Sequence, residues 1–100
     1  MTLTQFFYSR YLPEMEAKDR SKLTVIIYEN ALDYWGKLMD DPPLEAVDGK
    51  LVDAFRQRLT AVTYTRAFEL PIRRNLHDAT QQKHLRSVRS LLRRAGLTNI

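Results

Sequence analysis

The 100-residue sequence contains no cysteine and no long apolar run. Without cysteine, neither disulfide bonds nor thiolate metal sites contribute to the fold, and a reducing compartment is compatible with the chain. No window approaches the roughly 20 apolar residues of a membrane-spanning helix, and the N-terminus lacks the basic and apolar regions of a secretory signal. We therefore expect a soluble, cytoplasmic protein with no membrane partner.

Features typical of enzymes are also scarce. The sequence has no glycine-rich phosphate loop, and its two histidines are not accompanied by residues at metal-ligand spacing. His77 and His84 are interpreted as surface histidines. Asp40 and Asp41 precede two prolines and are typical of a helix end rather than of a catalytic pair. We expect no catalytic residue, no metal and no cofactor in this chain.

Positive charge is concentrated in the last third of the sequence. Residues 66–94 hold eight Lys or Arg against two acids, a net charge of +6, and the rest carries eight bases against ten acids, a net charge of −2. A basic third on a nearly neutral body is typical of a surface that binds the phosphates of nucleic acid. The alternative is a solvated helix surface without a partner.

The spacing of apolar residues predicts four helices, no β-sheet scaffold and one all-α domain. The helices are expected over about residues 3–17, 21–39, 48–60 and 78–95, with Ser21, Asp48 and Asp78 at their starts and Gly96 at the last end. Pro13 is expected to distort or end the first helix. The segment 61–77 lacks helical periodicity and is either a long loop or a short hairpin.

The last of these helices is predicted to have two different faces. Its inner face comprises Gln81, Leu85, Val88, Leu92 and Ala95. Its outer face is a cationic stripe with hydroxyl groups, suited to phosphate contacts, and comprises Lys83, Arg86, Ser87, Ser90 and Arg94.

Two helix starts add further candidate phosphate contacts. Thr80 lies in the first turn of the last helix, where backbone N–H groups are free. A second basic cluster lies at the start of the second helix and comprises Lys18, Arg20, Ser21, Lys22 and Thr24. These two sites form one surface if both helices begin on the same side of the molecule.

Four stretches of the chain match one family pattern in order: TLTQFFYSRYL, SKLTVIIYENALDYWGKL, PLEAVDGKLVDAFRQRL and ATQQKHLRSVRSLLRRAG. Together they resemble the SAM-like core-binding domain that precedes the catalytic domain in tyrosine recombinases and phage integrases. The resemblance covers nearly the whole chain, and its specificity comes from four degenerate motifs in register. Two features depart from the pattern: Gln81 stands where an aliphatic residue is common, and the segment before the last helix is longer.

The resemblance implies a four-helix SAM-like orthogonal bundle with a long loop before the last helix. Residues 1–96 would form the domain, which closes as half of a clamp on duplex DNA, and 97–100 would begin the linker to an absent catalytic domain. The implied core residues are Tyr28, Trp35, Phe55 and Leu85. The implied DNA contacts are Lys22, Thr24, Thr80, Gln82, Lys83, His84 and Ser87, to which the cationic stripe adds Arg86.

The implied function is duplex DNA binding during DNA integration or recombination. The implied partners are double-stranded DNA, the protein's own C-terminal catalytic domain and recombinase protomers in a synaptic tetramer, in a bacterial or phage-encoded protein of the nucleoid. This chain alone is not expected to cleave DNA, because the family's catalytic residues lie in the downstream domain. The alternative function is a helical protein–protein interaction module with a basic surface.

Overall fold

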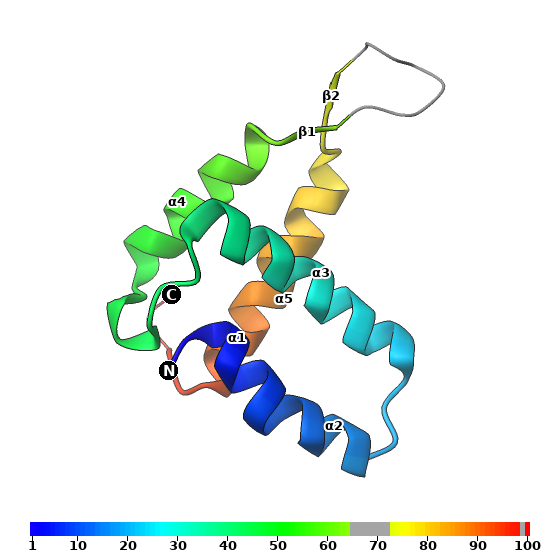
Figure 1. The fold of residues 1–100 in the computed structure, drawn as a ribbon. Coiled ribbons are helices and arrows are strands. Elements are labelled where there is room, and N and C mark those ends of the chain that lie inside the picture. Colours follow the sequence, from blue (N-terminus) through cyan, green and yellow to red (C-terminus); the bar gives the residue numbers. More distant parts are fainter. Residues whose placement is uncertain (65–72, 99) are drawn as a thin grey trace.

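The structure is a computed structural model that describes residues 1–64, 73–98 and 100. A bent helix at the N-terminus combines α1 (Leu3–Phe6), a π-helical turn (Phe7–Tyr11) and α2 (Leu12–Ala17). It is followed by α3 (Lys22–Met39), a 3-10 turn (Leu44–Ala46), α4 (Gly49–Thr60), strands β1 (Thr63–Tyr64) and β2 (Arg74–Asn75), and α5 (Asp78–Arg94) (Figure 1). The predicted all-helical architecture is thus confirmed in outline, with one small sheet added.

The N-terminal helix shows how a proline is accommodated without ending a helix. Thr2 caps its start in a reciprocal capping box with Gln5. Pro13 lacks an N–H donor, and its ring would crowd the preceding turn of a regular helix. The turn immediately before it is π-helical, with the Leu12 N–H donating to the Phe7 carbonyl oxygen. Pro13 therefore distorts the helix, as predicted, and the helix continues to Ala17.

Local signals also set the ends of α3 and α4. The Ser21 hydroxyl accepts the Thr24 backbone N–H at 3.2 Å, and the Asp48 carboxylate accepts that of Leu51 at 2.8 Å. Helix α3 ends where Asp40 adopts a left-handed φ of 61°. Both capping predictions are confirmed.

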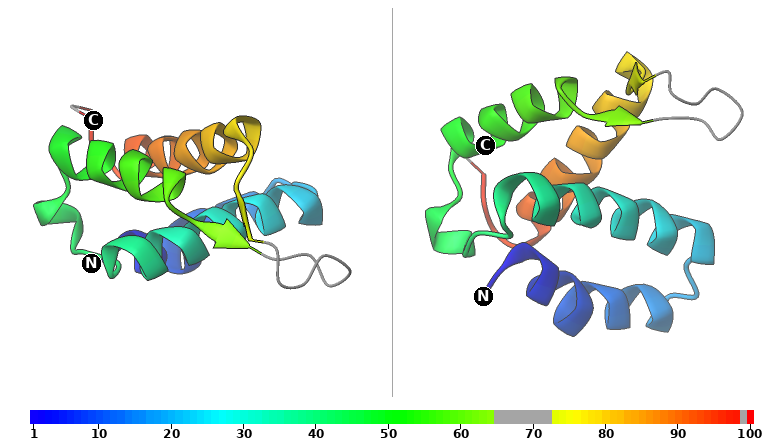
Figure 2. Two further views of the ribbon diagram at one scale, coloured as in Figure 1. Left: turned by 90° about the horizontal axis from the view of Figure 1, so that it is seen from above. Right: turned by 45° about the horizontal axis from the view of Figure 1, so that its top comes forward.

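The core forms where α5 packs against both α3 and α4, and Figure 2 shows α3 and α5 crossing. Trp35 and Phe55 are fully buried, with ring centroids 5.1 Å apart in an edge-to-face arrangement. Leu85 is also buried, as predicted. Tyr28 is only half-buried, because its hydroxyl lies near the surface, 3.4 Å from Ser90 Oγ.

The segment between α4 and α5 is not simply the long loop that the family resemblance implies. Its base is a two-stranded antiparallel hairpin, in which Thr63 pairs with Asn75 and Tyr64 with Arg74. The hairpin alternative is therefore correct for these residues. Residues 65–72, including Arg66, lie outside the described residues.

Among the described residues, no helix combines the length and the apolar character that a bilayer crossing requires.

Candidate nucleic-acid interface

The outer face of α5 carries cations that the protein itself does not neutralise. Lys83, Arg86 and Arg93 are exposed, and none forms a salt bridge within the described part of the chain. Arg89 is half-buried at the edge of this face, and its Nε has no hydrogen-bond partner among the described residues. The only acid of α5 is Asp78, in its first turn. We call Lys83, Arg86, Arg89 and Arg93 the basic face of α5.

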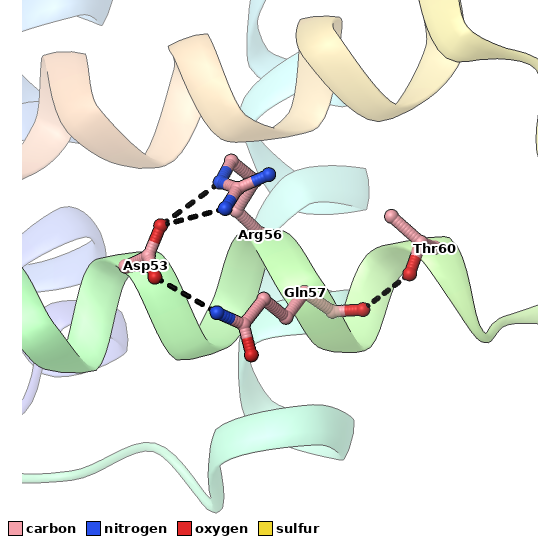
Figure 3. A network of polar contacts seen from close by, with 4 residues as sticks. All are labelled: Asp53, Arg56, Gln57 and Thr60. Carbon is pink, nitrogen blue, oxygen red and sulfur yellow. Dashed lines mark hydrogen bonds and ion pairs between the residues drawn. The ribbon is translucent and has the colours of Figure 1, made fainter.

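Other helices pair their outward cations within one helical turn. Lys18 lies 3.0 Å from Glu14, and Lys37 lies 2.9 Å from Asp33. On α4, Asp53 binds Arg56 and also accepts the side-chain amide of Gln57, as Figure 3 shows. Such intrahelical pairs are the ordinary arrangement of charges on a solvated helix. The basic face of α5 lacks these acidic partners.

Two of the expected DNA contacts are buried in the helix crossing. His84 and Ser87 are only 9% and 8% exposed, and the His84 ring lies 4.7 Å from the ring of Tyr34 on α3. The prediction that both lie on the outer surface is therefore wrong. The cause is that α5 packs against two helices, so its buried face is wider than the single apolar ladder Gln81–Leu85–Val88–Leu92.

Burial also changes the chemistry of His84. Loss of solvation disfavours the charged imidazolium, and the positive charge of Lys83 adds to this effect. Together they lower the pKa of His84 below its usual value. Neutral His84 is thus a component of the α3–α5 contact rather than a cation available to a phosphate.

The remaining members of the expected stripe also contact other elements. Ser90 is half-buried beside the Tyr28 hydroxyl. Arg94 is exposed, but its guanidinium carbon lies 5.1 Å from the centroid of the Tyr11 ring and its Nη1 lies 3.8 Å from the Glu14 carboxylate. Arg94 therefore stabilises the contact between α5 and the N-terminal helix.

The starts of α3 and α5 are not brought together. Tyr28 meets Ser90 and Tyr34 meets His84, so the two helices cross near Ala31 and Ser87 with opposed directions. Lys22 is nine residues before Ala31, about 14 Å along α3, and Thr80 is seven residues before Ser87, about 10 Å along α5. Lys22 and Thr80 thus lie on different arms of the cross (Figure 2).

Both helix starts are already partly satisfied. The backbone N–H of Thr24 donates to Ser21 Oγ, which also lies 3.1 Å from Thr24 Oγ1. At the start of α5 the N-cap is His77, without a side-chain capping bond, so the prediction that Asp78 caps the helix is wrong by one residue. Asp78 instead places a negative charge in the first turn, where it favours the helix dipole and disfavours a phosphate.

The two departures from the family pattern are connected in space. Gln81, half-buried, donates its side-chain amide to the Leu76 carbonyl oxygen at 2.9 Å. Asn75 donates its side-chain amide to the carbonyl oxygens of Thr60 at 3.0 Å and Val62 at 3.5 Å. A polar residue at position 81 therefore holds the end of the longer segment that precedes α5.

Of the eight expected DNA contacts, three are exposed on α5, namely Gln82, Lys83 and Arg86. Lys22 is exposed on α3, whereas Thr24 and Thr80 are half-buried. The sequence-based set omitted Arg89 and Arg93, although the spacing of residues 82, 86, 89 and 93 already indicates one helix face. Among the described residues no cluster of His, Asp or Glu is arranged to hold a metal ion.

Comparisons of this chain with protein-family models, with curated proteins and with solved structures find no match.

Proposed function

We propose that this chain binds duplex DNA through the basic face of α5, as the core-binding domain of a tyrosine-type recombinase or integrase. The carrying observation is the absence of acidic partners for Lys83, Arg86 and Arg93 on a helix whose neighbours pair their cations. Unpaired cations on one helix face attract phosphates because binding releases counterions from the duplex.

The family part of the proposal rests on the four sequence stretches in register and on the order of the helices along the chain. As a SAM-like core-binding domain, the chain would form half of a clamp, and a catalytic domain on the same polypeptide would form the other half. Duplex DNA, that catalytic domain and further protomers of a synaptic tetramer would be its partners. Strand cleavage and rejoining would belong to the catalytic domain.

The test is a titration of the chain with a labelled random-sequence duplex over a range of salt concentrations. Four phosphate contacts from the basic face predict a slope of about −3.6 in a plot of log affinity against log salt. Lys83→Glu combined with Arg86→Glu is expected to abolish binding, because it removes two contacts and adds two repulsive charges.

The matched control is Arg10→Glu combined with Lys50→Glu, which changes the net charge equally at exposed cations outside α5. This pair is expected to retain most of the affinity. Absence of binding to duplex DNA at low salt, with the helical circular dichroism spectrum intact, would contradict the proposal.

A second candidate function is a helical protein-interaction module, and one observation favours it. A groove of about 640 Å³ between α2 and α3 is lined by Leu12, Val25 and Ile26, and Ile26 is 50% exposed. In this case duplex binding would be absent, and a partner would protect Ile26 rather than Arg86 in an amide-exchange experiment.

A further inference from the structure

The β1–β2 hairpin contributes nothing to the buried core. Thr63, Arg73 and Asn75 are exposed, and Tyr64 is half-buried. A ladder of two residue pairs is only marginally stable by itself. Figure 1 shows the hairpin extending from the end of the bundle, on the opposite side from α1 and α2. Packing of the bundle therefore gives no reason for this extension.

The base of the hairpin is nevertheless held in place from both sides. Asn75 binds the carbonyl oxygens of Thr60 and Val62 at the end of α4, at 3.0 and 3.5 Å. Gln81 binds the carbonyl oxygen of Leu76 between β2 and α5 at 2.9 Å. These hydrogen bonds join the hairpin to both flanking helices and keep its direction relative to α5.

The charge of the hairpin has the same sign as the basic face of α5. Arg73 and Arg74 are adjacent and exposed, and no acid occurs among residues 63, 64 and 73–75. A two-stranded ribbon has the dimensions to enter the major groove of a duplex. A projecting ribbon that carries arginines thus has a shape and a charge that suit nucleic acid.

We propose that the β1–β2 hairpin is a second DNA-contacting element, which places Arg73 on the duplex next to the segment that α5 binds. This inference rests on the proposed DNA-binding function and adds to it a contact that the family resemblance does not assign. Lys83 and Arg93 are ten residues apart, about 15 Å along α5. From Asp78 to Arg73 an extended chain adds at most about 16 Å, which is about five base pairs of duplex.

The experiment measures the binding of the 100-residue chain to labelled duplexes of increasing length and at several salt concentrations. Arg73→Ala is expected to make the salt slope less steep by about 0.9, because one phosphate contact is lost. The duplex length beyond which affinity stops rising is expected to decrease by about five base pairs. Arg73→Lys keeps the charge and is expected to retain the wild-type slope.

Arg10→Ala is the matched control, because Arg10 is exposed on the N-terminal helix, at the opposite end of the molecule from the hairpin. It is expected to change neither the slope nor the required length. Asn75→Ala removes the two bonds to the end of α4 and is expected to act like Arg73→Ala, although Asn75 itself only positions the hairpin.

Wild-type slope and wild-type length dependence in both Arg73→Ala and Asn75→Ala, while the unaltered chain binds duplex DNA, would overturn this inference and leave the proposed function intact. Failure of the unaltered chain to bind any duplex would instead overturn the proposed function.

Discussion

Helices α3 and α5 are similar in length, with 18 and 17 residues, and they cross in the centre of the molecule, yet their outer faces differ. On α3, Leu23 and Ile26 are exposed, and Lys37 is paired with Asp33. On α5, the outward cations have no such partner. The comparison shows that local pairing, rather than the total charge of +4, distinguishes a surface suited to phosphates from an ordinary solvated helix.

The largest expected effect tests whether the two helices are equivalent on their inner faces. Trp35→Ala on α3 is expected to lower the free energy of unfolding by about 3–5 kcal/mol, and Leu92→Ala on α5 by about 2–5 kcal/mol, because both side chains are fully buried. Urea denaturation measures both values. Leu23→Ala, at a position 66% exposed, is the control and should change stability by less than about 0.5 kcal/mol.

A second change gives α5 the kind of ion pair that α3 has. Ala79→Glu places an acid four residues before Lys83, the favourable order for a helical pair. Neutralising one cation is expected to weaken duplex binding by about tenfold, with stability changed by less than about 0.5 kcal/mol. The reciprocal variant Asp33→Asn leaves Lys37 unpaired on α3. A gain in DNA affinity from Asp33→Asn would show that the two outer faces are not functionally different.

A third prediction concerns the contact between the helices. The pKa of His84 is lowered by burial and by Lys83, so below the usual value of 6.5 the unfolded chain binds a proton more readily than the folded protein. Stability is therefore full above pH 6.5 and is lost as the pH falls toward the folded-state pKa. Thermal unfolding between pH 7.5 and 5 measures the loss. His84→Gln should reduce the pH dependence, whereas His77→Gln, at an exposed position, should not.

The smallest effect is expected on the outer face of α3. Gly36 lies inside the helix, and a Cβ atom there would have no heavy atom of the fold within 4 Å. Gly36→Ala should therefore raise the free energy of unfolding by about 0.5–1 kcal/mol through helix propensity alone. A loss of stability in urea denaturation would mean that this face is more closely packed than the structure shows.

The helix boundaries were predictable from the sequence because their signals are local. Ser21, Asp48 and the Asp40–Pro43 segment act within one turn of the residues that they cap or terminate. Gly96, with a φ of 99°, ends α5 as predicted. The hairpin was left as one of two alternatives because its pairing joins Thr63 to Asn75 across twelve positions, which apolar periodicity does not reveal.

The candidate site was less predictable. An apolar ladder identifies one buried stripe of a helix, and by this criterion His84 and Ser87 belong to the outer face of α5. They are buried because α3 covers that side of the helix in addition to the side that α4 covers. Arg93, by contrast, was recognisable from its seven-residue spacing to Arg86.

The sequence by itself therefore determined where the helices begin and end and which third of the chain holds the positive charge, since capping and composition are properties of neighbouring residues. The tertiary structure alone decided which polar groups on α5 are accessible and that the starts of α3 and α5 lie apart. Both depend on the crossing near Ala31 and Ser87, two small buried residues that are 56 positions apart and whose proximity no local pattern specifies.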